Sequence, residues 1–175
     1  MNNISLKKLS PDDAPQIARL ANNKNIWDNL RDYIPHPYKL DDAISFIEMA
    51  SKQNPCLTFG MCSQDELCGV IGMNAQNDIY RKSAEIGYWL GEPYWGKGIT
   101  SAALKLMTDY AFKVLDVNRI YTSVFENNHA SMRVLEKNGY TKEGVLRKAV
   151  YKNDVFLDEH RFGILRSEWT NRSSK

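Results

Sequence analysis

The chain is 175 residues long, which suits one domain and leaves little room for two. Hydrophobic residues make up 43% and charged residues 25%, as in a globular protein with a sizeable core. A net charge of +2, a pI near 8.4 and the absence of a basic tract argue against nucleic acid as a partner. No apolar run approaches a membrane span and the N-terminus lacks a signal-peptide core, so we expect a soluble, cytoplasmic protein with no membrane partner.

The first half of the chain is predicted to contain a strand, two helices and then three strands. Ser10 and Pro11 are typical of a helix start, and the apolar residues that follow lie on one helical face. Polar turns separate the later apolar runs, which predicts an antiparallel meander. The predicted elements are the strand Ile4–Leu9, the helices Pro11–Ala21 and Asp41–Lys52, and the strands Leu57–Cys62, Leu67–Asn77 and Glu85–Leu90.

The second half is predicted to alternate helices and strands. Strand, helix and strand within Glu85–Phe125 require a crossover, so these two strands are expected to be parallel. Together the elements predict an α+β fold: one mixed, mostly antiparallel sheet of seven strands with helices on both faces. Residues 170–175 are expected to fray. The predicted elements are the helices Ile99–Leu115 and Ala130–Asn138, the latter ended by Gly139, and the strands Arg119–Phe125, Arg147–Lys152 and Val155–Leu165.

The cysteines and histidines do not form a metal-ligating pattern. The three cysteines contain no CxxC pair, so buried free thiols in a reducing compartment are expected. The three histidines are far apart along the chain, and no metal is expected. These residues are Cys56, Cys62 and Cys68, and His36, His129 and His160.

The stretch Glu85–Ser101, EIGYWLGEPYWGKGITS, carries the strongest functional signal. A predicted strand is followed by Gly96-Lys97-Gly98, which opens directly into a predicted helix. The unpaired N–H groups and the dipole at such a helix start favour a phosphate or pyrophosphate group. The spacing matches neither a Walker loop nor a dinucleotide fingerprint, because Ser101 stands where the third glycine should be. Taken alone, the motif is also compatible with an ordinary turn.

A second motif, Asn128 to Tyr140, changes that balance. With it the chain resembles the GNAT acetyltransferase superfamily, specifically its RimJ/RimL-like branch. The resemblance covers roughly Leu6 to Trp169 in the right order, so we expect one N-acetyltransferase domain over that range, with a GNAT-like fold. Four separated motifs carry it: Trp95–Thr100 for the acyl-CoA loop; Asn128, Ser131, Lys137, Gly139 and Tyr140; Glu143–Arg147 for EGxxR; and Pro37-Tyr38 with Asp41–Ala43 and Phe46-Ile47.

The resemblance implies an acetyl-CoA site divided between two elements. Backbone amides of the loop would hold the pyrophosphate, and the strand edge at Tyr88–Leu90 would pair with the pantetheine arm. Asn128 would bond the ligand, cap a helix, or do both. Trp95 and Thr100 depart from the family pattern, and the Thr100 side chain could crowd the pyrophosphate or donate to it. The implied cofactor-binding residues are Tyr88, Trp89, Leu90, Trp95, Gly96, Lys97, Gly98, Ile99, Thr100, Asn128, Ser131 and Lys137.

Acetyl transfer needs a neutral amine, an oxyanion donor and an acid for the leaving thiolate. Glu85 is the candidate base, with an ion-paired strand glutamate as the alternative. A backbone N–H near Trp89–Leu90 would serve the oxyanion. Ser131 is the candidate acid, with helix capping as the alternative. Tyr140 and Tyr88 are further candidate acids, with core packing as the alternative role for both. The C-terminal strands have no glutamate at Ala149–Tyr151, where some members of the branch have one.

The acceptor site is expected near Trp27–Tyr38 and the turn at Val150–Asp154. Tyr33, His36 and Tyr38 could line it, or they could pack the loop against the sheet. The expected function is acetyl-CoA-dependent N-acetylation of a primary amine, preferably the N-terminal α-amine of a protein, for example a ribosomal one. The alternatives are a small-molecule amine (a polyamine, an amino-acid derivative or an antibiotic) and a non-catalytic acyl-CoA sensor. The protein is expected to be a monomer or homodimer.

Overall fold

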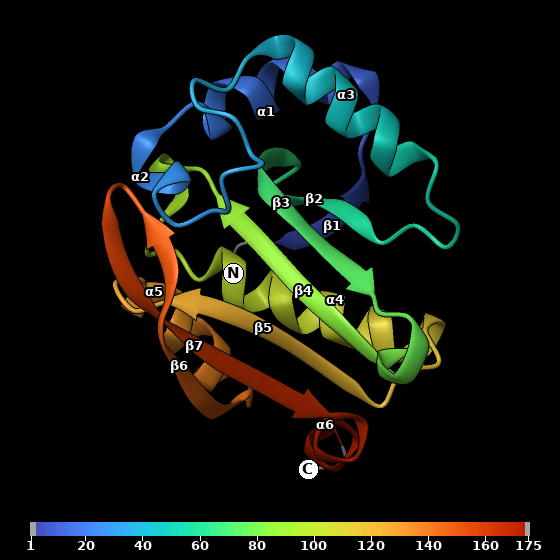
Figure 1. Cartoon of the computed structure of the whole chain (residues 1–175). Helices are drawn as coiled ribbons and strands as arrows, with labels where there is room; N and C mark the ends of the chain where they lie inside the picture. The colour runs from blue at the N-terminus through green and yellow to red at the C-terminus, as the bar shows by residue number, and fades with distance from the viewer. Residues whose placement is uncertain (1–2, 174–175) are drawn as a thin grey trace. The chain divides into compact units, whose positions relative to one another are not determined.

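The computed structural model describes residues 3–173, which form an α+β fold (Figure 1). The strands are β1 (Ile4–Lys8), β2 (Thr58–Ser63), β3 (Glu66–Ala75), β4 (Ser83–Leu90), β5 (Arg119–Phe125), β6 (Thr141–Lys152) and β7 (Val155–Leu165). The α-helices are α1 (Ala14–Ala21), α2 (Lys24–Trp27), α3 (Leu40–Ser51), α4 (Ile99–Val114), α5 (His129–Lys137) and α6 (Arg166–Ser173). Short 3-10 turns are η1 (Pro11–Asp13), η2 (Asp78–Tyr80) and η3 (Glu92–Tyr94).

The strands form a seven-stranded sheet in the order β1-β2-β3-β4-β5-β7-β6. The pairs β1/β2, β2/β3, β5/β7 and β6/β7 are antiparallel. Strands β4 and β5 are parallel, and their pairing runs from Ser83–Arg119 to Glu85–Tyr121. The predicted fold class, with its single parallel crossover, is therefore confirmed.

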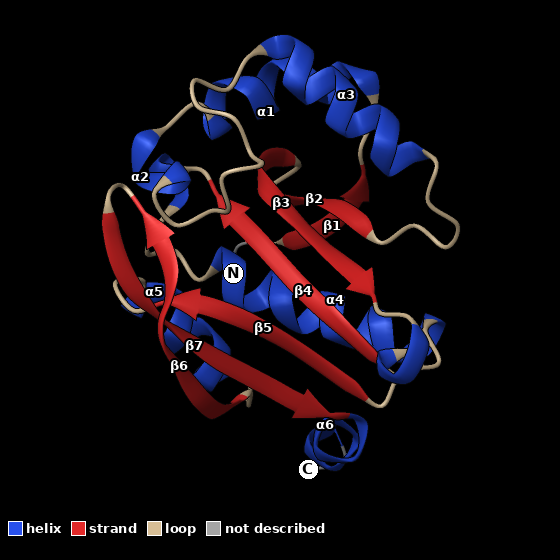
Figure 2. Ribbon diagram, in the orientation of Figure 1, coloured by secondary structure: helices blue, strands red, loops and turns tan. Residues whose placement is uncertain are grey.

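The chain clusters into two compact units, which are described separately. The first comprises the described part of Met1–Gly72 together with Tyr88–Met107. In it α1 and α3 pack against each other, with β1, β2 and β3 in the same unit (Figure 2). The buried side chains of α1 and α3 recur three or four residues apart, which is the amphipathic pattern expected from the sequence. This core contains Ala14, Ile17, Ala43, Ile47, Cys62, Leu67 and Val70.

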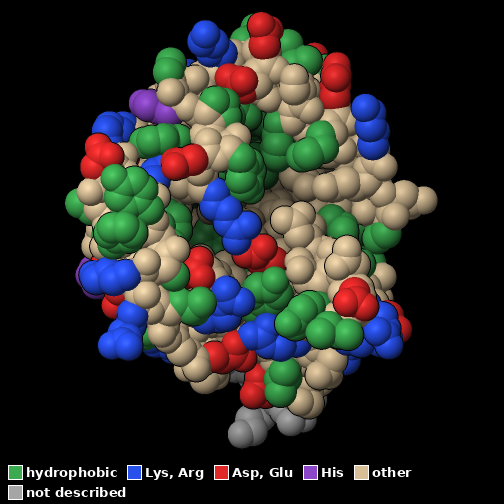
Figure 3. Space-filling view, viewed as in Figure 1, with side chains coloured by type: hydrophobic (Ala, Val, Ile, Leu, Met, Phe, Trp, Pro, Cys, Tyr) green, Lys and Arg blue, Asp and Glu red, His purple; other side chains and the backbone are tan. Residues whose placement is uncertain are grey.

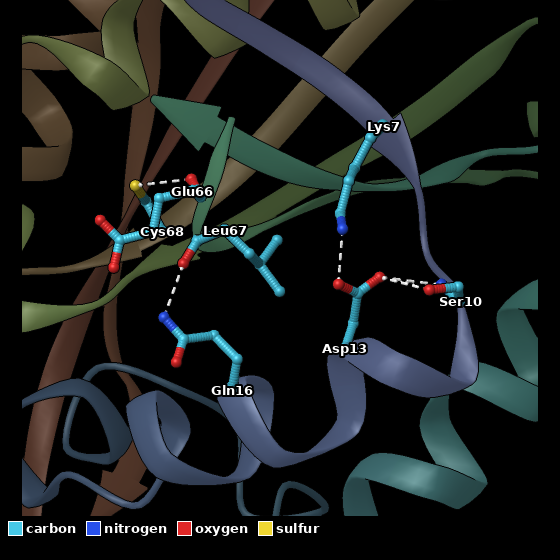
Figure 4. A network of polar contacts seen from close by, with 7 residues as sticks. All are labelled: Lys7, Ser10, Asp13, Gln16, Glu66, Leu67 and Cys68. Carbon is cyan, nitrogen blue, oxygen red and sulfur yellow. Dashed lines mark hydrogen bonds and ion pairs between the residues drawn. The ribbon is translucent and has the colours of Figure 1, made fainter. Parts of the chain in front are cut away.

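A polar network fixes the start of α1 in the first unit (Figure 4). The Asp13 carboxylate accepts from Lys7 Nζ at 2.5 Å, and from the Ser10 N–H and hydroxyl at 2.9 and 3.2 Å. Gln16 Nε2 donates to the Leu67 carbonyl oxygen at 3.0 Å, which ties the helix to β3. The predicted start at Ser10 and Pro11 is confirmed, although the first turn is η1 rather than α-helix.

The second unit comprises Met73–Gly87 together with the described part of Thr108–Lys175. Along β5 the residues alternate between buried and half-buried positions, so one face of this strand belongs to the core. The Arg166 guanidinium donates to carbonyl oxygens near the end of α4, including those of Phe112 and Val117. These bonds satisfy helix-end carbonyls that have no intrahelical donor.

Two predictions about the C-terminal part were wrong. Strand β6 begins at Thr141 rather than Arg147, and α6 occupies residues that were expected to fray. Gly144 and mostly exposed side chains hide the alternation of β6, and its pairing shifts twice, between Lys142 and Gly144 and again farther along. The α6 sequence is polar, but Trp169 is buried and donates to Asp109 Oδ1 at 2.6 Å. The part of that prediction covering residues 174–175 lies outside the described residues.

Candidate active site

The end of β4 is tied to the loop that follows it within the first unit. The Trp95 indole Nε1 donates to the Leu90 carbonyl oxygen at 2.7 Å. A Cβ on Gly69 would collide with the Trp89 carbonyl oxygen, so glycine is required for β3 to approach this backbone. Three of the predicted cofactor residues, Trp89, Leu90 and Trp95, therefore form one continuous piece of structure. The Leu90 carbonyl is already used by Trp95, which limits how a ligand could pair with it.

The predicted phosphate loop has the backbone geometry that such a site needs. Gly96 and Gly98 have φ values of +74° and +76°, in the left-handed region that favours glycine. A Cβ added to either residue would meet nothing within 4 Å, so the loop backbone is open to an approaching group. Helix α4 begins at Ile99, and the first N–H groups of a helix lack intrahelical acceptors. Open backbone and a helix N-terminus together fit a pyrophosphate.

The side chains of this loop and of the first turn of α4 differ in burial. Ile99 is 1% exposed and fixes the start of α4 in the core. Lys97 is exposed, with its Nζ 5.6 Å from the centroid of the Tyr94 ring. The Tyr94 hydroxyl donates to Glu66 Oε1 at 2.5 Å. Thr100 is half-buried in the first turn of α4. Lys97 is therefore an exposed cation within the loop, where it could meet an anionic ligand.

The second motif lies in the second unit, at the start of α5. The Asn128 Oδ1 accepts from the Ser131 N–H at 3.1 Å, so Asn128 caps this helix. This bond does not use the donors of the Asn128 side-chain amide. Ser131 is half-buried in the first turn, and Lys137 is exposed at the last helical residue. Capping by Asn128 is confirmed, and the ligand roles of these residues stay predictions.

Tyr140 lies in the core of the second unit. Its side chain is 2% exposed, and its hydroxyl is 2.8 Å from Thr108 Oγ1 on α4. Gly139 before it has φ +83°, which confirms the predicted left-handed end of α5. The buried bond to Thr108 favours core packing for Tyr140 over a role as an acid.

Glu85 occupies the last paired position between β4 and β5 in the second unit. It lies opposite Tyr121 in the parallel register and is half-buried. The neighbours Ala84 and Ile86 are fully buried, so Glu85 projects from the opposite face of the strand. Its role as a base stays a prediction that this position supports.

The three predicted acceptor residues have different environments within the first unit. Tyr33 is 75% exposed, and His36 stacks on Trp27 with ring centroids 5.4 Å apart. Tyr38 packs against the core under α1 and α3. Burial raises the pKa of the Tyr38 phenol to about 12, and the nearby Asp42 carboxylate adds to this effect. The packing alternative therefore fits Tyr38, whereas Tyr33 and His36 remain accessible.

A charged face on β5 and β7 was missed by the sequence reasoning. Tyr121 and Ser123 on β5 share this face with Glu159 and Arg161 on β7, because Ser123 lies directly opposite Arg161 in the antiparallel register. Basic and acidic side chains gather over these two strands in Figure 3. The β5 sequence RIYTSVF places Arg119, Tyr121 and Ser123 at every second position, which was a signal for the β5 half of this face but not for its pairing with β7.

Among residues 3–173, no three His, Cys, Asp or Glu side chains are grouped to hold a metal ion. Within the same part of the chain, no helix is long and apolar enough to cross a membrane. All three cysteines are free thiols, as predicted, but Cys56 is only half-buried rather than buried. Burial raises the pKa of the thiols of Cys62 and Cys68.

A family model and a curated relative both identify the chain as similar to acetyltransferases. The family model described as an acetyltransferase (GNAT) domain matches residues 3–141. A relative named putative ribosomal N-acetyltransferase YdaF, from Bacillus subtilis (strain 168), is 30% identical over 181 residues, covering 95% of this chain and 93% of its own length.

Solved structures agree with this family. RimL, a ribosomal α-N-protein acetyltransferase in complex with coenzyme A, has a TM-score of 0.79 and 27% identity, with 93% of each chain covered. Spermidine N-acetyltransferase from Vibrio cholerae, in complex with CoA and spermine, has a TM-score of 0.80 and 26% identity, with 96% of this chain and 98% of that one covered.

Proposed function

The chain belongs to the GNAT acetyltransferase family and is an N-acetyltransferase, and we propose that it transfers the acetyl group of acetyl-CoA to the N-terminal α-amine of a protein. The observation that carries the donor half is the loop at Gly96 and Gly98, whose open backbone leads into α4. The bound thioester supplies the activated acetyl group, and the chain's own residues bind it and prepare the amine.

The donor is held mainly by backbone in this proposal. Amides from Gly96 to Thr100 bind the pyrophosphate, and Lys97 adds a cation beside it. The backbone N–H groups of Tyr88–Leu90 pair with the pantetheine arm and polarise the thioester carbonyl, because preorganised donors stabilise the developing oxyanion. The Asn128 side-chain amide contributes a further donor. The Leu90 carbonyl is held by Trp95, so we assign pantetheine pairing to the remaining groups of this strand end.

Glu85 is proposed to remove the proton from the attacking amine, directly or through water. An α-amine with a pKa near 8 costs about 1.4 kcal/mol to deprotonate at pH 7. A lysine-like amine costs about 4.6 kcal/mol, because its pKa lies roughly 3.4 units above pH 7. One half-buried carboxylate is therefore sufficient for an α-amine. Ser131, in the first turn of α5, is the proposed acid for the leaving thiolate.

The choice of acceptor rests on the relatives. YdaF is named for ribosomal acetylation and the RimL structure for α-N-protein acetylation, which favours a protein N-terminus. The Vibrio cholerae protein acts on spermidine, so a polyamine is the second candidate. Exposed Tyr33 and accessible His36 are proposed to contact the acceptor. Free thiols and a protein acceptor are both compatible with a cytoplasmic enzyme.

The test measures CoA thiol release from acetyl-CoA with matched amines. The panel contains peptides that differ only in the first residue, the same peptides with a blocked N-terminus, spermidine, and lysine derivatives. We expect free α-amines to be the fastest acceptors and lysine-like amines to react measurably but slowly, and mass spectrometry should place one acetyl group at the N-terminus of each unblocked peptide. Faster turnover of spermidine than of every peptide would replace the protein acceptor by a polyamine. Saturable acetyl-CoA binding without thiol release for any amine would support the sensor alternative.

A further inference from the structure

The Tyr121 ring lies within cation–π distance of two arginine side chains on the charged face of β5 and β7. The guanidinium Cζ atoms of Arg119 and Arg161 are 4.8 and 5.4 Å from its centroid. Cation–π attraction to one ring favours keeping both guanidinium groups close to it. A guanidinium kept there still presents its planar fork of donors for directional recognition of a planar anion.

The two arginines differ in how well their charges are paired. Arg119 forms a close ion pair with Glu143 on β6. Arg161 reaches Glu159 only at 3.4 Å, through its Nη2 atom, although the Glu159 side chain is 16% exposed and lies two residues away on the same strand. A contact of this length is weaker than an ordinary charge-assisted hydrogen bond of about 2.7–2.9 Å. Arg161 is therefore the cation on this face that can accept a better anion.

Two buried donors point to the same place. Among the described residues, Arg161 Nε and Ser123 Oγ are covered from solvent and have no hydrogen-bond partner. Ser123 and Arg161 are directly opposite each other on β5 and β7, so their side chains project from one face. Unpartnered buried donors are rare in native proteins because each costs free energy. Both atoms are covered in this structure, so a carboxylate oxygen reaches them only when the Glu159 side chain moves away from Arg161. In that position it would satisfy both donors.

We propose that Arg161 and Ser123 form a subsite for a carboxylate group of the acceptor. The inference rests on the proposed function, because it specifies which amines the same enzyme prefers. Glu85 lies opposite Tyr121, and adjacent strands are about 4.8 Å apart. The Arg161 guanidinium also lies near Tyr121, at 5.4 Å from its ring centroid, so an amine bound at Glu85 and an anion bound at Arg161 would both lie beside this one residue. The preferred acceptor is an amine with a carboxylate close to it: a peptide beginning with Asp or Glu, or a free amino acid.

The test compares amines that differ only in this carboxylate. Peptides beginning with Asp and Asn form one pair, and a free amino acid and its amide form the other. We expect the wild-type kcat/KM to favour the acid in at least one pair by about tenfold, the worth of one charge-assisted hydrogen bond. The pair that shows the larger ratio identifies whether the carboxylate comes from the first side chain or from the free α-carboxyl group. A ratio near one in both pairs would refute the subsite.

Three variants give results of opposite sign. Arg161→Gln should bring the acid-to-amide ratio close to one, and Ser123→Ala should lower it by a smaller factor. Glu159→Gln should raise the ratio, because it removes the competing carboxylate. Arg119→Gln is the matched control, because it removes a cation that also lies near the Tyr121 ring. Glu143 already pairs with Arg119, so the acid-to-amide ratio should not change. If circular dichroism shows that Arg161→Gln does not fold, the acid-to-amide ratio of Glu159→Gln still tests the subsite: a higher ratio supports it, and an unchanged ratio contradicts it.

A binding measurement separates this inference from the proposed function. Isothermal titration measures ligand binding to the CoA-bound protein and needs no turnover. The first ligand pair is N-acetyl-aspartate and N-acetyl-asparagine, and the second is an N-acetyl amino acid and its amide. If the wild type acetylates no amine but binds an acid about tenfold more tightly than its amide, the proposed function fails and the subsite stands. If no acid binds more tightly than its amide, or if the preference survives in Arg161→Gln, the subsite is refuted even when the enzyme is active.

Discussion

The Trp95 indole donates its Nε1–H to the Leu90 carbonyl oxygen, so the loop that follows β4 is fastened to the end of that strand. The family pattern places Gln or Arg at this position. A tryptophan can replace them without loss of binding if backbone amides hold the pyrophosphate and the side chain only sets the loop's path. Trp95 is 45% exposed, which agrees with a fastening role at the surface.

Trp95→Phe should therefore weaken CoA binding a few-fold and lower the free energy of unfolding by about 0.5–1.5 kcal/mol, the worth of one hydrogen bond. Isothermal titration and urea unfolding measure the two quantities. Trp27→Phe is the matched control, because Trp27 Nε1 makes the same kind of bond to the Ile34 carbonyl oxygen at 2.9 Å. Trp27→Phe should lower the free energy of unfolding by a similar amount and leave the Kd for CoA unchanged. An unchanged Kd in Trp95→Phe would show that this bond does not shape the loop.

Gly98→Glu should abolish CoA binding, because the side chain strains a residue with φ +76° and adds negative charge beside the pyrophosphate. The space around the Cβ is open, so the fold should survive with a loss of about 1–2 kcal/mol. Gly144→Glu is the control: its Cβ is equally unobstructed and its φ is not positive. Equilibrium binding of CoA to both variants gives the answer, and unchanged affinity in Gly98→Glu would contradict the pyrophosphate assignment.

Glu85→Gln should slow turnover of lysine-like amines by about 10²–10⁴-fold, the range for loss of a general base. Peptide α-amines should lose much less, because a larger fraction of them is already neutral at pH 7. The ratio of the two effects, measured as kcat across pH 6–9, reports on the proton transfer. Glu136→Gln, an exposed change on α5, serves as the control. Equal losses for both amine classes would exclude Glu85 as the base.

The fold could be predicted from the sequence wherever one face of an element is buried. Along β5, RIYTSVF, half-buried and buried positions alternate strictly, and the bounds of this strand were predicted without error, as were those of β7. The first half of β6 was missed because its side chains are mostly exposed and its register shifts, so no period of two appears. Helix α6 was missed because a buried Trp169 and a carboxylate of Glu168 bonded to the Leu165 N–H, rather than an apolar stripe, hold it in place.

The candidate site was predictable to the extent that backbone conformation determines it. Positive φ at Gly96 and Gly98 follows from their being glycines in a turn before a helix. Side-chain roles that depend on distant partners were not predictable. The bond from Tyr140 to Thr108 joins residues 32 positions apart, and the pairing of Ser123 with Arg161 depends on the register of β5 and β7. No local pattern contains either relationship.

Asp13→Asn should lower the free energy of unfolding by about 1–3 kcal/mol at pH 7, because it removes a buried acceptor for Lys7 and Ser10. Burial raises the pKa of the Asp13 carboxyl, but the Lys7 ammonium and the Ser10 donors outweigh burial and hold that pKa below its ordinary value. Its stabilisation is therefore complete above about pH 4, the ordinary pKa, and is lost as pH falls through the lower folded value.

The difference between Asp13→Asn and wild type should consequently shrink below pH 4 in urea unfolding. Asp12→Asn, the exposed neighbour in η1, should change stability by only a few tenths of a kcal/mol at any pH. A difference for Asp13→Asn that stays constant from pH 7 to pH 3 would mean that the ion pair with Lys7 does not stabilise the fold.

Tyr140→Phe should affect stability more than catalysis. It removes the hydroxyl that lies 2.8 Å from Thr108 Oγ1 in the core, which costs about 0.5–1.5 kcal/mol. The double variant Thr108→Val with Tyr140→Phe should recover part of that loss, because replacing both polar partners with apolar groups of similar shape is nearly neutral. If Tyr140 instead protonates the leaving thiolate, kcat should fall by about 10²–10⁴ while stability hardly changes. Ser131→Ala gives the comparison, since Ser131 is the proposed acid and its loss should lower kcat with little effect on unfolding. Urea unfolding and kcat measured on the same three variants therefore assign Tyr140 to the core or to the reaction.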